Sequence, residues 1–255
     1  MADQMIFKRY EIKYLLHQNQ YQQIRKIMEK FMETDNFGHS TIHSLYLDTP
    51  DFLLARRSLE KPFYKEKLRL RSYGDTTDTS TVFVEIKKKY DSVVYKRRIA
   101  MTEIEARQYI LSHKAVNDSQ ISREISYFMT HYENLSPKVL ISYERDAFFA
   151  AADNNLRITF DSNVLWRDYD LKLTSKVYGI PVLDPDLILM EIKTAKAMPL
   201  WLVQALSENH IYKTSFSKYG TAYQTMLMNQ QIPAFAFGSQ HTSFDFTQGG
   251  NYNYA

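Results

Sequence analysis

Polar and apolar residues alternate along several short segments of the chain, and a period of two predicts β-strands. In EKLRLRSY, lysine or arginine occupies every second position from 67 to 71, with leucines between them. Strands are predicted on this basis near 7–15, 43–48, 66–73, 80–89, 92–101, 139–151, 156–167 and 182–195. The short connections KKYDSV and ADNN lie between consecutive strands and predict antiparallel hairpins.

Apolar residues spaced three to four positions apart predict helices between these strands. The segment 19–32 shows this spacing, and Thr102 lies three residues before Glu105, which is the sequence of a capping box at a helix start. Further helices are predicted near 119–134, 198–209 and 218–230. The expected fold class is therefore α+β, with a mostly antiparallel sheet and helices on its outside.

The composition limits the domain organisation and the chemistry. The chain has 255 residues and no cysteine, so disulfides, thiol catalysis and thiolate metal sites are excluded. We expect one domain over 1–230 and a disordered tail over 231–255, where aromatic, Gly, Asn and Gln residues occur without periodicity. The absence of a long apolar run leads us to expect a cytoplasmic protein.

Positive charge is concentrated in one part of the chain. The net charge is only +3, but the segment from Arg56 to Arg98 contains thirteen basic and only six acidic residues. A local excess of this size indicates an anionic partner, such as phosphate.

The tripeptide EIK occurs at 11–13, 85–87 and 191–193, each time in a predicted strand. Residues two apart on a strand share a face, so each copy places a carboxylate beside an ammonium group. Such faces usually point to solvent. Here the opposite faces are strongly apolar and flanked by predicted helices, and the charges are mostly basic, so we favour a barrel with these faces turned inward. Lys and Arg would bind phosphate there, and the carboxylates would hold a divalent cation.

The order RYEIKY, RLR, VEIK, KRR, YERDAF, RITFD, EIK and SFSKYG resembles the catalytic domain of the vacuolar transporter chaperone (VTC) polyphosphate polymerases, over about residues 6–228. That family belongs to the triphosphate tunnel metalloenzyme, or CYTH-like, superfamily. The resemblance implies an antiparallel eight-stranded β-barrel tunnel flanked by helices. It also implies synthesis of inorganic polyphosphate from ATP with a divalent metal, Mn²⁺ or Mg²⁺.

The resemblance also implies the roles of individual residues. Catalytic roles fall on Lys13, Arg69, Arg71, Lys87, Lys96 and Arg145, substrate-phosphate binding on Arg157, Lys193, Ser217 and Lys218, and metal binding on Glu191. The broader superfamily begins with E-x-E-x-K, but Arg9 stands here at the first glutamate. This departure favours the polymerase branch over small-triphosphate hydrolases and adenylate cyclases.

Two other functions remain open. Water could replace the acceptor phosphate, which would make the protein a tripolyphosphate or nucleoside triphosphate hydrolase. A non-catalytic polyphosphate- or nucleotide-binding module would keep the basic wall without the metal carboxylate. Nucleic acid is not an expected partner, because the aromatic residues near KKK and KRR do not share one face with the basic residues. The expected partners are ATP, polyphosphate and a separate membrane protein that would bring the chain to a membrane.

Overall fold

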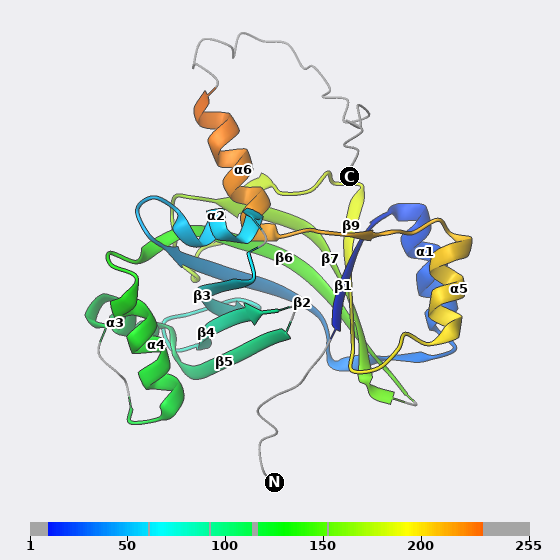
Figure 1. The fold of residues 1–255 in the computed structure, drawn as a ribbon, viewed down its shortest axis with the longest axis horizontal. Helices are drawn as coiled ribbons and strands as arrows, with labels where there is room; N and C mark the ends of the chain where they lie inside the picture. The colour runs from blue at the N-terminus through cyan, green and yellow to red at the C-terminus, as the bar shows by residue number, and fades with distance from the viewer. Residues whose placement is uncertain (1–9, 61, 92, 114–116, 152, 232–255) are drawn as a thin grey trace.

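The computed structural model describes residues 10–231 except 61, 92, 114–116 and 152 (Figure 1). Its strands form one antiparallel sheet in the order β10-β1-β9-β7-β6-β2-β3-β4-β5, with β8 paired to β7. The strands are β1 Tyr10–His17, β2 Met32–Asp48, β3 Tyr64–Tyr73, β4 Thr81–Tyr90, β5 Val93–Thr102, β6 Ser136–Ala150, β7 Asp153–Arg167, β8 Ile180–Pro181, β9 Leu187–Thr194 and β10 Lys213–Thr214. The helices are α1 Gln18–Met28, α2 Leu53–Glu60, α3 Glu103–Ser112, α4 Gln120–His131, α5 Leu200–Glu208 and α6 Lys218–Gln231.

The predicted fold class is confirmed, with two differences in the elements. All eight predicted strands are present, but β2 begins at Met32, eleven residues before the predicted start at His43. Helix α2 was not predicted; the buried carboxylate of Asp48 accepts the backbone N–H groups of Leu54 and Ala55 in its first turn. The predicted tail covers 231–255; Gln231 is the last residue of α6, and residues 232–255 lie outside the described residues.

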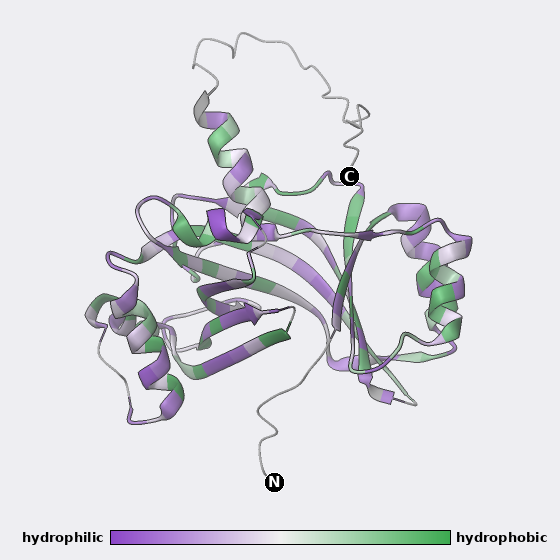
Figure 2. Ribbon diagram, in the orientation of Figure 1, coloured by the Kyte–Doolittle hydropathy of each residue, from purple (hydrophilic) through white to green (hydrophobic). Residues whose placement is uncertain are grey.

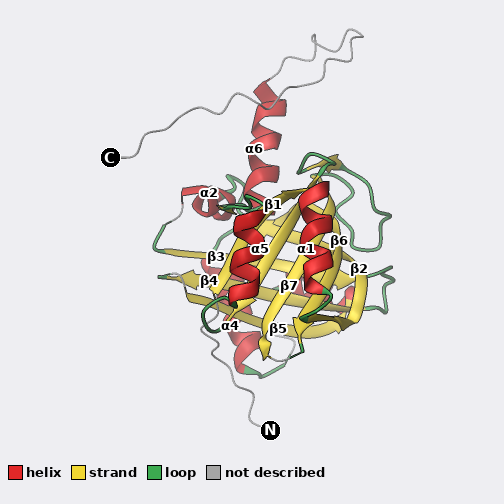
Figure 3. Cartoon of the chain, turned by 90° about the vertical axis from the view of Figure 1, so that its right-hand side faces the viewer, coloured by secondary structure: helices red, strands yellow, loops and turns green. Residues whose placement is uncertain are grey.

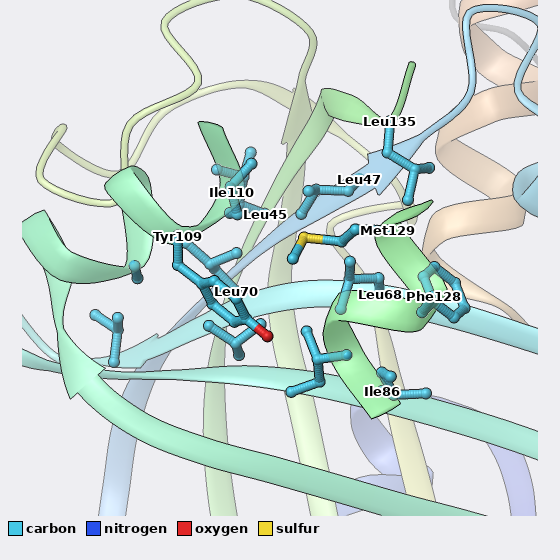
Figure 4. Close-up of a cluster of buried hydrophobic side chains, with 14 of the residues drawn as sticks. Leu45, Leu47, Leu68, Leu70, Ile86, Tyr109, Ile110, Phe128, Met129 and Leu135 are labelled. Carbon is cyan, nitrogen blue, oxygen red and sulfur yellow. The ribbon is translucent and has the colours of Figure 1, made fainter. Parts of the chain in front are cut away.

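Helices cover the outer face of the curved sheet in two places. Helices α3 and α4 pack over β2–β5 through a core that includes Leu68, Leu70, Ile86 and Phe128 (Figure 4). Helices α1 and α5 lie side by side over β1, β7 and β9 (Figure 3). Apolar positions of these strands pack in the two outer cores, and charged residues two apart on the same strands share the inner face. Hydrophilic and hydrophobic residues both occur along the strands (Figure 2).

A third core occupies part of the inner face. Helices α2 and α6 pack there against β2, β6 and β7. Gly220 allows their close approach, because a Cβ at this position would lie 2.7 Å from Leu59 of α2. This packing fixes the start of α6 beside the charged part of the inner face.

Within the described residues, no helix is both long and apolar enough to cross a membrane.

The sheet is not closed into a strict barrel, contrary to the expectation. The outermost strands of the order are β5, with ten residues, and β10, with only two. With two residues, β10 is too short to form a hydrogen-bond ladder with β5 at the opposite edge of the sheet. The two sides of the sheet instead meet through side chains, since Lys87 Nζ on β4 lies 3.3 Å from Glu11 Oε2 on β1.

The packing of β3 predicts the effect of a charge on its outer face. Leu70 is 1% exposed under α3 and α4, so Leu70→Asp would bury an unpaired carboxylate. We expect the free energy of unfolding to fall by about 3 kcal/mol or more. Urea unfolding followed by circular dichroism measures the change. Leu111→Asp on α3 is the control, since Leu111 is 85% exposed, and a harmless Leu70→Asp would invert the assignment of the two faces.

Candidate active site

The inner face of the sheet brings together charged residues from seven strands, β1, β3, β4, β5, β6, β7 and β9. Cross-strand pairing fixes the arrangement: Arg69 lies opposite Glu85, and Lys13 lies opposite Glu191. All the sequence-predicted site residues of the strands lie on this face, and Ser217 and Lys218 reach it from the start of α6. These residues form a mostly cationic surface on the inner face, called the tunnel below after the fold that the sequence resembles.

Glu191 on β9 lies at the centre of the first group of charges. Its carboxylate oxygens are 3.3 Å from Lys13 Nζ, 3.6 Å from Lys193 Nζ, 3.8 Å from Lys218 Nζ and 3.9 Å from an Arg145 nitrogen. Burial by itself would raise the pKa of Glu191, but these four cations outweigh it and hold the pKa well below its usual range. Glu191 is therefore ionised, and its neighbours are oriented toward it.

Asp161 on β7 binds two of the cations that surround Glu191. Arg145 donates from Nε and Nη2 to the two carboxylate oxygens at 2.5 and 2.6 Å, and Lys218 also binds the carboxylate. Asp161 is fully buried, and although burial opposes ionisation, Lys218 and Arg145 lower its pKa. The bidentate geometry fixes the guanidinium of Arg145 within the tunnel wall.

Glu85 on β4 organises a second group of cations. Arg69 donates to Glu85 Oε2 from Nε at 3.0 Å and from Nη2 at 2.8 Å, and Lys96 Nζ lies 2.6 Å from Oε1. Arg71 beside them donates to the Tyr143 hydroxyl at 2.9 Å. Burial would raise the pKa of Glu85, but Arg69, Arg71 and Lys96 lower it to about 2.

The segment between β10 and α6 closes one side of the tunnel. Thr214 pairs with Lys13 on β1, and Lys13 Nζ donates to the carbonyl of Phe216 at 2.9 Å. Lys67 Nζ on β3 then donates to Ser217 Oγ at 3.1 Å. Ser217 also caps α6, since its Oγ accepts the N–H of Gly220. The helix start is therefore directed into the tunnel, where its dipole favours an anion.

The predicted residues are not equally engaged. Arg157 lies opposite Lys193 on the inner face, but it is exposed, and its side chain makes no hydrogen bond or ion pair within the described part of the chain. The structure places three further carboxylates and one further lysine among the predicted cations. They are Glu11, Glu85, Asp161 and Lys67. For the two glutamates of the EIK motifs the sequence predicted only a general role in holding a cation, and for the other two residues it predicted no individual role. Strand parity could have identified them, because each shares the face of a predicted residue on its own strand.

The donor set allows a divalent cation only together with phosphate. Glu191 and Glu11 both lie near Lys13 Nζ, at 3.3 and 3.8 Å. In the described part of the chain, no three acidic or histidine side chains are grouped so that they could hold a metal by themselves. One or two carboxylates plus phosphate oxygens are, however, a usual ligand set for Mg²⁺. The residues present fit a metal that enters with its substrate.

The buried state of Glu85 gives a pH prediction. Its folded pKa, about 2, lies below the ordinary value of 4.5, so its contribution to stability is present above pH 4.5 and is lost as the pH falls toward 2. Glu85→Gln should lower the free energy of unfolding near neutral pH by about 2–3 kcal/mol, with the deficit shrinking in acid. Urea unfolding of both proteins across this range measures the deficit. A deficit independent of pH would contradict the assignment.

The comparisons with known proteins agree with this arrangement. The family model described as "VTC domain" matches residues 8–227. Curated relatives named "Vacuolar transporter chaperone complex subunit 4" include one from Trypanosoma brucei brucei, 28% identical over 170 residues, and one from Schizosaccharomyces pombe, 23% identical over 282 residues. The matches cover 55% and 89% of this chain but only 21% and 38% of those relatives.

A solved structure from Bacillus halodurans, reported as a candidate adenylate cyclase, has the same fold. It has a TM-score of 0.51 at 12% identity and covers 82% of this chain and 95% of its own. The resemblance found in the sequence is thus confirmed for the family and for the tunnel fold. With the family model matched over nearly all the described residues, the chain belongs to the VTC domain family.

Proposed function

We propose that this protein synthesises inorganic polyphosphate by transferring the γ-phosphoryl group of ATP to a growing chain inside the tunnel. The observation that carries the proposal is the group around Glu191, in which four cations surround one buried carboxylate. Such an excess of positive charge is stabilised by a polyanion. The resemblance of this chain to the VTC family implies polyphosphate synthesis, and the match to the VTC relatives supports the same substrate class.

The residues have separate tasks in this reaction. Arg69, Arg71 and Arg145 are held by hydrogen bonds before substrate arrives, so their free N–H groups can orient phosphate oxygens with little loss of side-chain entropy. The lysines of the wall add positive charge where negative charge develops during transfer. The terminal phosphate of the chain attacks in line and ADP leaves, so no side-chain nucleophile is required.

Glu191, assisted by Glu11, is the proposed holder of a divalent metal, Mn²⁺ or Mg²⁺. When bound, the metal would supply positive charge that offsets the negative charge of the phosphates. Thr159 faces the same place, opposite Glu191, and its buried Oγ1 has no hydrogen-bond partner in the described structure. That hydroxyl is available to phosphate or to water.

A protein partner is also part of the proposal. The curated relatives are subunits of a complex, and the chain spans between a fifth and two fifths of their length. We infer that a separate membrane protein receives the product and holds the chain at a membrane. Co-purification of tagged protein from solubilised membranes, with a soluble fraction as control, would detect it.

Incubation of purified protein with ATP and Mn²⁺, with the products resolved on a gel, tests the activity. A ladder of polyphosphate is expected. Free phosphate without polymer would assign hydrolysis to the same site. Binding of polyphosphate without turnover of any triphosphate, with Mn²⁺ or Mg²⁺, would assign a binding module instead.

Truncation of the wall arginines should reduce the reaction without unfolding the protein. Arg69→Ala and Arg71→Ala each remove a charge-assisted phosphate contact of about 1.5–3 kcal/mol, so we expect at least a roughly tenfold fall in synthesis rate. Lys88→Ala is the control, because Lys88 lies on the outer face of β4, paired with Glu66. Normal synthesis by both arginine variants would remove β3 from the site.

Glu191→Gln separates binding from chemistry. The substitution keeps the shape of the side chain but removes the charge proposed to hold the metal. Affinity for polyphosphate should be retained or increased, because a repulsive charge has gone, while metal-dependent synthesis should be lost. Calorimetric titration and the gel assay on one preparation measure the two effects. Unchanged synthesis would exclude Glu191 as the metal ligand.

A further inference from the structure

Lys67 differs from the other lysines of the tunnel in its partners. Each of the other tunnel lysines named above has a carboxylate oxygen within 4 Å, supplied by Glu11, Glu85, Asp161 or Glu191. No such ion pair of Lys67 occurs in the described structure. Its Nζ donates to the neutral Ser217 Oγ at 3.1 Å and lies 5.7 Å from the centre of the Tyr219 ring. Two of its three possible donors therefore have no protein acceptor in the described tunnel.

The groups that face Lys67 are mostly positive. Lys13 approaches from β1, Lys87 from β4 and Lys65 along β3, while the Tyr46 hydroxyl faces it from β2. Burial is the largest effect, and together with these lysines it lowers the pKa of Lys67 to about 7, against the opposing influence of Tyr46. Arginine in the same wall stays charged at any relevant pH. Lys67 is thus a cation site that is only partly charged near neutral pH while the tunnel holds no anion.

We propose that Lys67 is a further phosphate-binding residue and that a phosphate chain binds to it together with a proton. The inference rests on the phosphate-binding part of the proposed function. The amine of Lys67 takes a proton from water and becomes an ammonium group. One N–H remains on Ser217 Oγ, and the other two can donate to phosphate oxygens, whose charge then stabilises the ammonium form.

Tyr46 should also take up a proton when phosphate binds. Its hydroxyl accepts a hydrogen bond from Arg69 Nη1 at 3.1 Å. Burial would raise the pKa of Tyr46, but Arg69, Lys67 and Arg71 lower it to about 7. A bound phosphate offsets those positive charges, so the pKa of Tyr46 rises and this hydroxyl also takes up a proton. Lys67 and Tyr46 both take up protons on binding, so their contributions to the measured proton uptake add.

The sign of the pH dependence follows from this uptake. Binding that takes up protons weakens as the pH rises. Below about pH 7 Lys67 is protonated with or without phosphate, so affinity should level off there. Above that value affinity should fall with pH, until the pKa of Lys67 in the complex is passed.

Isothermal titration calorimetry with long-chain polyphosphate tests the proposal directly, because the interior phosphates of this probe carry no titratable proton near neutral pH. Titrations near pH 7.5 in two buffers of different ionisation enthalpy give the number of protons taken up. Wild-type protein should show net uptake. Lys67→Arg, which carries a fixed charge, should still bind but take up about half to one proton less per site.

Lys88→Arg is the matched control, since Lys88 lies on the outer face of β4, 3.7 Å from a Glu66 oxygen; its proton uptake should equal that of the wild type. Equal uptake by wild type and Lys67→Arg would overturn the proposal, and so would the absence of polyphosphate binding by wild type. The gel assay for synthesis is independent of the proton count. A protein that takes up protons at Lys67 but makes no polymer would therefore refute only the proposed polymerase activity.

Discussion

The structure depends on the confinement of many positive charges between the two sides of one curved sheet. Four carboxylates, Glu11, Glu85, Asp161 and Glu191, are each shared by at least two lysines or arginines. They hold the cations in place but do not neutralise them all. The remaining positive charge is electrostatically unfavourable without an anion, because buried charges need partners. This excess of positive charge is what supports the proposed binding of a polyanion.

The rest of the architecture makes this confinement tolerable. The apolar positions of the strands pack outward against two pairs of helices, so folding is driven by ordinary hydrophobic burial on the convex side. Helices α2 and α6 fill the apolar part of the concave side and leave the charged part free. The close contact of Gly220 with Leu59 fixes the helix start that carries Ser217 and Lys218. The two larger hydrophobic cores and the proposed site thus lie on opposite faces of the same strands.

In the proposed site, binding of phosphate and transfer of a phosphoryl group require nearly the same side chains. A basic wall alone would bind phosphate chains, whereas phosphoryl transfer also needs the reacting phosphates to be aligned and their charge neutralised. In the proposed reaction, Glu191 is the group that separates binding from catalysis, because its carboxylate is ionised and it lies opposite Thr159, whose hydroxyl has no hydrogen-bond partner in the described structure. Lys67 adds a dependence on protons to the same wall. All these features lie on side chains of the tunnel and leave the backbone of the fold unchanged.

The sequence by itself determined the alternation of charge along the strands, since the side chains of a strand point to opposite faces with a period of two. Parity was therefore enough to group Arg69 with Arg71, and the order of motifs was enough to indicate the family. Parity cannot say which strands become neighbours or how far a sheet closes. The pairing of Lys13 with Glu191, the contact of Lys87 on β4 with Glu11 on β1, and the early start of β2 all depend on contacts between residues far apart in the sequence. The partly charged state of Lys67 was decided in the same way, because a pKa depends on burial and on neighbouring charges that only the tertiary structure brings together.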